Sequence, residues 1–210
     1  MALYIAFEGG EGSGKSTQVR LLAKALSEPD LAEFGLPVVT HEPGATPLGI
    51  QLRQLLLDVD QAPVGIRAEA LLMAADRAQH MDEVVRPALA AGRHVISDRT
   101  AYSSLAYQGG GRELGVDQIR SVNDWAIDGL WPELVLLLDC PPAAAASRRS
   151  RALDRLEAET NGFHERVRST FVELAAEDPG RWVVIDGSRP IDEVAAEVMA
   201  VVASRIEATS

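Results

Sequence analysis

The segment FEGGEGSGKST, from Phe7 to Thr17, carries the clearest chemical signal in the chain, and Gly9 to Ser16 within it fits the pattern G-x-x-x-x-G-K-[ST]. Glycines in such a loop let successive backbone N–H groups turn toward phosphate oxygens, and a following helix adds the positive end of its dipole. We therefore predict a nucleotide phosphate site, with Lys15 at the outer phosphates and the Ser16 hydroxyl on Mg²⁺. The predicted nucleotide-binding residues are Gly9, Gly10, Glu11, Gly12, Ser13, Gly14, Lys15, Ser16 and Thr17.

Glu11 is an unexpected residue inside a phosphate-binding loop, because a carboxylate repels a triphosphate. Its presence is reasonable if the side chain faces away from the phosphates, toward a neutral hydroxyl on a second substrate. The loop therefore indicates two ligands.

A second chemical signal follows the apolar run HVISD (94–98), where Asp98 and Arg99 stand in succession. An aspartate at the carboxyl end of a strand beside a nucleotide loop is placed to hold a Mg²⁺-bound water, so we predict Ser16 and Asp98 as the metal-binding residues. Arg99 would direct its planar fork at phosphate oxygens. The next residues, SSLAYQGGG (103–111), offer hydroxyls, an amide and an aromatic ring, which suit a sugar and a base.

Short runs rich in Val, Ile and Leu and longer segments with apolar residues every three or four positions must hold these residues in place. Near-continuous apolar runs are typical of strands buried on both faces of a parallel sheet. Their alternation with helical segments predicts a doubly wound α/β fold with a five-stranded parallel sheet, formed as a single domain over residues 1–210. The predicted strands are LYIAFE (3–8), PVVTHE (37–42), HVISD (94–98), LVLLLD (134–139) and WVVID (182–186).

Composition limits the possible partners. The net charge of −11 argues against a general nucleic-acid binder, which needs a basic face. The sequence contains no run of 18 apolar residues, the length needed to span a membrane. Lysine occurs only at positions 15 and 24, so further phosphate contacts must come from arginine. A single cysteine, Cys140, excludes an intrachain disulfide and favours a cytoplasmic location.

Several segments, taken in order, resemble the bacterial thymidylate kinase family across nearly the whole chain. They are FEGGEGSGKST, THEPGAT-PLG, LLMAADRAQH, SDRTAYSSLAYQGGGR, LDRLE and the closing VVID. The resemblance implies transfer of the γ-phosphoryl group of ATP to dTMP, which gives dTDP and ADP, with Mg²⁺ as cofactor. It also implies the P-loop kinase fold and a cytosolic homodimer.

The resemblance assigns residues to the phosphate and sugar of dTMP. Glu11 resembles the family residue that contacts the deoxyribose 3′-hydroxyl. Arg53 and Arg99 resemble the family residues that bind the dTMP phosphate. Tyr107 resembles the ring that excludes a ribose 2′-hydroxyl. His41 is a departure, because the family commonly has an arginine there, near the same phosphate.

The base end of dTMP is assigned in the same way. Arg77 resembles the arginine that reads thymine, and Ser104 and Gln108 resemble the partners of the thymine edge. Met73 stands where the family usually packs a phenylalanine on the base. Glu42, in the EPG motif, belongs to the same set of expected dTMP contacts.

The segment SRRSRALDRLE (147–157) resembles the lid that closes over ATP, although it is a residue shorter than the usual pattern. Arginines on this lid would neutralise charge on the transferring phosphoryl group. The predicted catalytic residues are Lys15, Asp98, Arg99, Arg148, Arg149, Arg151 and Arg155.

Two alternatives remain open from the sequence. One is another small-molecule or nucleotide kinase, which a substrate panel would distinguish. The other is a switch protein that hydrolyses a nucleoside triphosphate, although the chain has no N-K-x-D guanine-reading motif.

Overall fold

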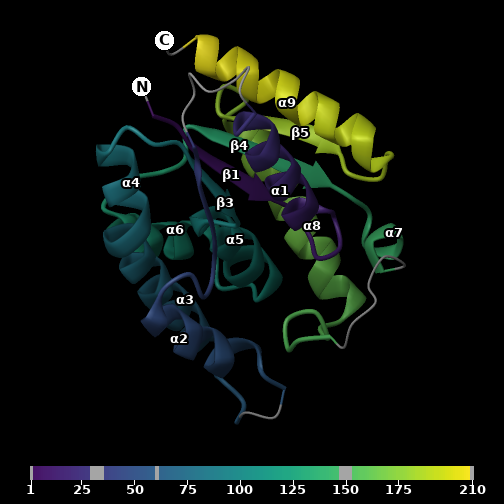
Figure 1. Cartoon of the computed structure of the whole chain (residues 1–210). Coiled ribbons are helices and arrows are strands. Elements are labelled where there is room, and N and C mark those ends of the chain that lie inside the picture. Colours follow the sequence, from purple (N-terminus) through teal and green to yellow (C-terminus); the bar gives the residue numbers. More distant parts are fainter. Residues whose placement is uncertain (1, 29–35, 60–61, 147–152, 209–210) are drawn as a thin grey trace.

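The computed structural model describes residues 2–28, 36–59, 62–146 and 153–208 (Figure 1). Strands and helices alternate along this part of the chain, and η2 and η3 are stretches in which the helix widens toward i→i+5 hydrogen bonding. In chain order the elements are β1 (Tyr4–Glu8), α1 (Lys15–Leu26), β2 (Val38–His41), α2 (Pro47–Leu57), α3 (Ile66–His80), η2 (Met81–Val85), α4 (Arg86–Ala90), β3 (Val95–Asp98), α5 (Ala101–Ser104), η3 (Leu105–Gly111), α6 (Val116–Ile127), β4 (Leu134–Asp139), α7 (Pro142–Ala146), α8 (Asn161–Glu177), β5 (Trp182–Asp186) and α9 (Ile191–Glu207).

The described residues form one five-stranded sheet in the order β2-β3-β1-β4-β5, with every pair parallel. Each strand lies within the apolar run predicted for it, so the predicted α/β fold with a five-stranded parallel sheet is confirmed. Because all strands run the same way, their carboxyl ends meet at one edge of the sheet, which is where α/β proteins bind ligands.

The alternation of side chains along β4 explains how helices cover both faces of the sheet. Leu134, Leu136 and Leu138 pack with buried side chains of α1 and α9, which lie together over one face (Figure 1). Val135 and Leu137 point to the other face and pack with α8, α5 and η3. A strand that is apolar on both faces is therefore buried on both, as its sequence predicted.

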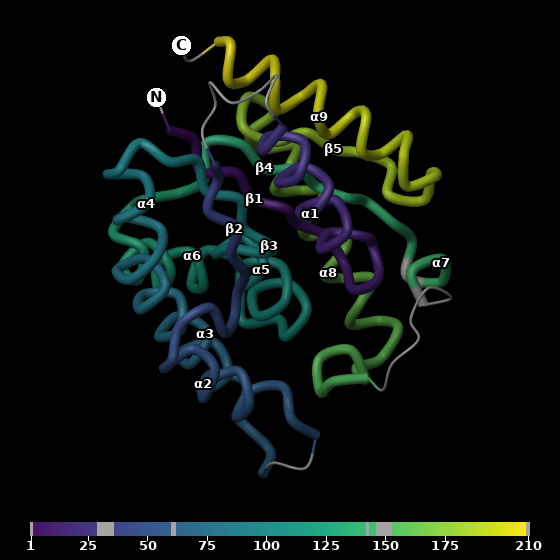
Figure 2. Tube along the Cα trace, viewed as in Figure 1, coloured from purple at the N-terminus to yellow at the C-terminus, as the bar shows by residue number. Residues whose placement is uncertain are grey.

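The glycines of η3 allow it to lie directly against its neighbours. A Cβ atom at Gly111 would meet the Phe163 ring at 2.6 Å, and one at Gly110 would overlap the Thr170 hydroxyl, both on α8. The close approach seats η3 between α8 and α6. In Figure 2, α2 and α3 lie side by side at the end of the molecule opposite α9.

Candidate active site

A cavity of about 1480 Å³ opens at the carboxyl ends of the strands. Its wall includes the glycine loop and α1, the ends of β2 and β3, parts of α2, α3 and η3, and the loop after β5, together with Leu153, Asp154, Leu156 and Glu157. This volume exceeds that of a typical site for one small ligand, so the cavity has room for two nucleotides.

The glycine loop leads from β1 into α1, as predicted. Gly9, Gly12 and Gly14 have φ values of 135°, 78° and 98°, which side-chain-bearing residues rarely adopt. The Lys15 side chain is buried and donates hydrogen bonds to the carbonyl oxygens of Gly9 (3.1 Å) and Gly10 (2.8 Å). Burial, together with the Arg99 cation, lowers the pKa of Lys15. The ammonium group therefore lies at the base of a loop built for anions.

The predicted metal-binding residues lie in contact. The Ser16 hydroxyl donates to Asp98 Oδ2 at 2.5 Å, so a hydroxyl and a carboxylate converge from the first turn of α1 and the end of β3. Such oxygen donors fit Mg²⁺, which binds a few protein oxygens and completes its shell with water and phosphate. The described residues contain no cluster of three or more His, Cys, Asp or Glu suited to a metal, so a bound cation would need oxygen atoms from the nucleotide.

Arg99 lines the cavity and has φ 73°, in the left-handed region. It donates to Gly9 O (3.1 Å), Ser103 Oγ (3.0 Å) and the Tyr107 hydroxyl (3.1 Å), and it forms an ion pair with Glu11. The Glu11 carboxylate thus contacts Arg99 and the Tyr107 hydroxyl.

The protonation states of this group follow from its surroundings. Burial would raise the pKa of Glu11, but the Arg99 and Lys15 cations outweigh burial and hold it at about 2. Burial raises the pKa of Tyr107, so its hydroxyl stays protonated and donates to Glu11 Oε1 at 3.3 Å. The site therefore presents a fixed carboxylate and a phenol beside Arg99.

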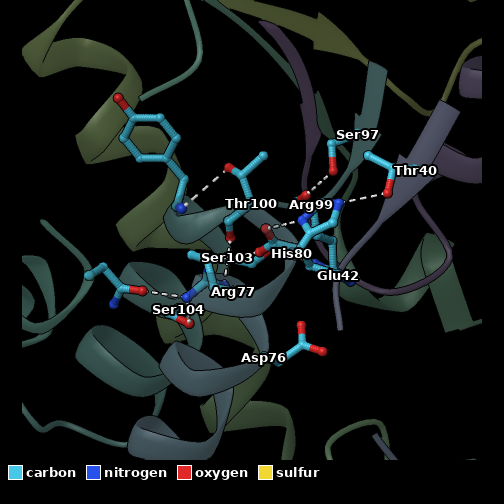
Figure 3. A network of polar contacts seen from close by, with 12 residues as sticks. Thr40, Glu42, Asp76, Arg77, His80, Ser97, Arg99, Thr100, Ser103 and Ser104 are labelled. Atoms are coloured by element: carbon cyan, nitrogen blue, oxygen red, sulfur yellow. Dashed lines mark hydrogen bonds and ion pairs between the residues drawn. The ribbon is translucent and has the colours of Figure 1, made fainter. Parts of the chain in front are cut away.

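Arg77 is held by a buried polar network (Figure 3). Its Nε donates to Glu42 Oε2 at 2.7 Å and its Nη2 to Thr100 O at 3.2 Å, while Nη1 donates to Ser104 Oγ at 3.1 Å and also to Asn123 Oδ1. A guanidinium group has five N–H donors, so one N–H on Nη2 has no partner among the described residues. The Arg77 guanidinium group therefore lines the cavity, held in place by its four hydrogen bonds, and keeps one N–H donor on Nη2.

Behind Arg77 the network continues to β2. His80 Nδ1 donates to Glu42 Oε1 at 2.9 Å, and His80 Nε2 lies 2.6 Å from Thr40 Oγ1 (Figure 3). Burial would raise the pKa of Glu42, but Arg77 and His80 outweigh it and lower the pKa below its ordinary value. Glu42 therefore acts as a buried anion that orients Arg77.

The remaining predicted dTMP residues also line the cavity. Arg53 donates to Pro43 O at 2.7 Å, and Met73 is buried in the core cluster at the cavity wall. His41, at the end of β2, is open to solvent on one side, and its partial burial together with the Arg53 cation lowers its pKa. These side chains, with Ser104, Tyr107 and Gln108, are brought to one cavity from distant parts of the sequence.

The predicted lid arginines have a different outcome. Arg148, Arg149 and Arg151 lie outside the described residues. Arg155 is described, but it does not line the cavity; its Nη2 lies 3.7 Å from Glu69 Oε2. The structure therefore does not bring Arg155 together with the other predicted catalytic residues.

Several polar residues of the site were missed by the sequence analysis, among them Glu8 and Asn123. Glu8, fully buried at the end of β1, accepts hydrogen bonds from Thr100 N (2.8 Å), Thr100 Oγ1 (2.7 Å) and Ser103 Oγ (2.6 Å). Asn123 lies on the buried face of α6 and contacts Arg77. A polar residue in an otherwise apolar strand or helix face is the only sequence signal that could have marked them.

A parallel sheet in this order, a glycine-rich loop that opens a helix, and an Asp-Arg pair at the end of the neighbouring strand are the features of a P-loop kinase. Residues 7–198 match the family model described as thymidylate kinase. The chain is 48% identical to the thymidylate kinase of Leifsonia xyli subsp. xyli, in an alignment that covers 93% of this chain and 92% of the relative. It is 49% identical to the thymidylate kinase of Bifidobacterium longum strain DJO10A, with 93% of this chain and 95% of the relative covered. It is also 42% identical to the thymidylate kinase of Geotalea uraniireducens, with 98% of this chain and 99% of the relative covered. The chain belongs to the thymidylate kinase family, as the resemblance predicted.

Among the described residues, no helix combines the length and apolar character needed to cross a membrane.

Proposed function

We propose that the protein transfers the γ-phosphoryl group of ATP to dTMP and releases dTDP and ADP. The observation that carries the proposal is that one cavity is lined by the glycine loop, with its Glu11 side chain, and by Arg99 and the buried Arg77. The bond between the γ-phosphorus and the ADP oxygen breaks, and a bond to a phosphate oxygen of dTMP forms. No side-chain nucleophile is needed, because such enzymes act by alignment and charge stabilisation.

On the donor side, the backbone N–H groups of residues 9–17 and the Lys15 ammonium would hold the ATP phosphates. Mg²⁺ would be held by the Ser16 hydroxyl and, directly or through water, by Asp98, and it supplies charge neutralisation between phosphate oxygens. Lys15 and Arg99 place further fixed positive charge where negative charge develops on the transferring group.

On the acceptor side, Arg53, Arg99 and His41 would surround the dTMP phosphate. Glu11 would accept a hydrogen bond from the deoxyribose 3′-hydroxyl, and the Tyr107 ring would occupy the space that a 2′-hydroxyl needs. Arg77, Ser104, Gln108 and Met73 would contact the base, with Glu42 holding Arg77.

The lid and the oligomeric state belong to the same proposal. Residues 147–157 would close over ATP as part of one domain spanning residues 1–210. The catalytic arginine would be Arg148, Arg149 or Arg151, since Arg155 lies behind the cavity wall beside Glu69. A homodimer is supported by large apolar side chains exposed on the adjacent helices α3 and α6, where Leu71 is 60% and Trp125 is 86% exposed. The cytoplasm, where ATP and dTMP are available, is the proposed location.

A panel of acceptors tests the proposed function. Purified protein is incubated with ATP, Mg²⁺ and dTMP, dUMP, dCMP, dAMP or dGMP, and the nucleoside diphosphates are quantified by chromatography. We expect dTMP to have the highest kcat/KM. Preference for another acceptor would favour a different nucleotide kinase, and ATP hydrolysis without any phosphorylated acceptor would favour a switch protein.

A further inference from the structure

Behind the cavity wall, the carboxylate of Glu69 on α3 joins the base end of the site to a group of arginines. Its side chain is 1% exposed and does not line the cavity. Glu69 Oε1 accepts from Gln108 Nε2 at 2.9 Å and from Arg112 Nε at 3.2 Å, and Oε2 accepts from Arg112 Nη2 at 3.0 Å. Arg155 Nη2 approaches Oε2 to 3.7 Å. Glu69 is therefore shared between a cavity-lining amide and two cations.

The contact with Glu69 decides which way the Gln108 amide faces. A carboxylate accepts hydrogen bonds and donates none, so only the NH₂ end of an amide is stable against it. The opposite end of the amide is the carbonyl oxygen, an acceptor. Gln108 itself is buried and lines the cavity, so its orientation determines what the base pocket offers to a ligand.

Arg77, the other residue proposed to bind the base edge, offers a donor where Gln108 offers an acceptor. Arg77 retains one N–H donor, and it is linked by a hydrogen bond to Ser104, one helical turn before Gln108. A donor on Arg77 and an acceptor on Gln108, both in the wall of one cavity, match a base edge that carries a carbonyl next to an N–H group, as thymine does at O4 and N3. Cytosine presents the reverse order there, an amino group next to an unprotonated ring nitrogen, and would leave buried polar groups unpaired.

We propose that Glu69 is a positioning residue that sets base selectivity by locking the orientation of the Gln108 amide. The inference rests on the proposed function and deepens it, because it assigns selectivity to a residue that does not touch the substrate. A stability role alone is a weak reason for the arrangement, since a buried ion pair commonly stabilises a protein no better than apolar side chains of the same size. Selectivity explains why an anion occupies this place.

Glu69→Gln tests the proposal, because glutamine keeps the shape but can present either end of its amide to Gln108. The measurement is kcat/KM for dTMP and for dCMP. We expect the dTMP/dCMP ratio to fall about tenfold or more, through a higher KM for dTMP with a largely retained kcat. Glu69→Asp keeps the charge but withdraws the carboxylate from Gln108, so it should also lower the dTMP/dCMP ratio. It serves as the second variant if Glu69→Gln folds poorly.

A double-mutant cycle separates positioning from a general structural effect. In a Gln108→Ala background, Glu69→Gln should leave the dTMP/dCMP ratio unchanged, because the amide on which it acts is gone. The matched control is Glu159→Gln, which removes a carboxylate from the same arginine, Arg112, without touching Gln108. This control should keep the wild-type ratio.

The outcomes distinguish the two proposals. A wild-type enzyme that does not prefer dTMP overturns the proposed function itself. A wild-type enzyme that prefers dTMP, with an unchanged ratio in both Glu69 variants, overturns only the role of Glu69. An equal loss of selectivity from Glu69→Gln with and without Gln108 also overturns it, because the effect would then not pass through the amide.

Discussion

Replacing Glu8 by glutamine should make the stability of the protein less dependent on pH. Burial raises the pKa of Glu8 from the ordinary value of 4.5 to about 7, although its hydrogen bonds from Ser103 and Thr100 oppose the shift. As pH rises above 4.5 the unfolded chain releases this proton, while the folded protein keeps it until about pH 7. The stability contributed by the protonated carboxyl is therefore complete below pH 4.5 and is lost as pH rises through about 7.

The size of the effect follows from the difference in pKa between the folded and unfolded states. A rise from 4.5 to about 7 corresponds to roughly 3.4 kcal/mol of lost stability at high pH, of which about 2 kcal/mol is lost between about pH 5.5 and 8. The free energy of unfolding of Glu8→Gln should not contain this loss. The wild-type value minus the variant value should therefore fall by about 2 kcal/mol over that range.

Urea unfolding, followed by far-UV circular dichroism at several pH values, measures this difference without any nucleotide. Glu83→Gln, which removes an exposed carboxyl, is the control for the loss of one acid. A wild-type minus Glu8→Gln difference that stays constant from about pH 5.5 to 8 would refute the reasoning. It would mean that the Thr100 and Ser103 hydrogen bonds fully compensate for the burial of the charge.

Three further predictions concern the loop, the phosphate end and the packing of η3. Lys15→Ala should reduce kcat by orders of magnitude with an unchanged circular dichroism spectrum, because a preorganised cation is lost from the transition state; a folded variant with near-normal turnover would contradict the glycine-loop assignment. His41→Arg should tighten dTMP binding about tenfold by calorimetry at pH 7–9, because the lowered pKa keeps His41 neutral there whereas arginine stays charged; equal Kd values would show that the side chain does not face the phosphate. Gly110→Ala should lower the free energy of unfolding by about 1–3 kcal/mol in urea, because its Cβ would overlap the Thr170 hydroxyl, and the double change with Thr170→Ala should recover part of the loss; an unchanged stability would show that η3 can move away from α8.

The sequence by itself determined the sheet and the nucleotide loop, because both depend on local patterns. Runs such as LVLLLD are apolar on both faces and can be buried only in the middle of a layered fold. The spacing of glycines before Lys15 needs no distant residue to form a phosphate-binding turn. Arg99 could be predicted from its place after Asp98 at the end of a strand. Arg53 and Arg77 could be named as site residues only through the resemblance to a family, since an isolated arginine has no local signature.

Only the tertiary structure decided the partners of those side chains. Arg77 meets Glu42, Thr100, Ser104 and Asn123 because β2, α3, α5 and α6 converge on it, and these contacts span 23 to 46 positions in the sequence. Glu69 and Gln108 are 39 positions apart and carry no pattern that links them. Long-range polar contacts depend on how packed elements are placed in space, so neither hydrophobic periodicity nor a motif could have predicted them.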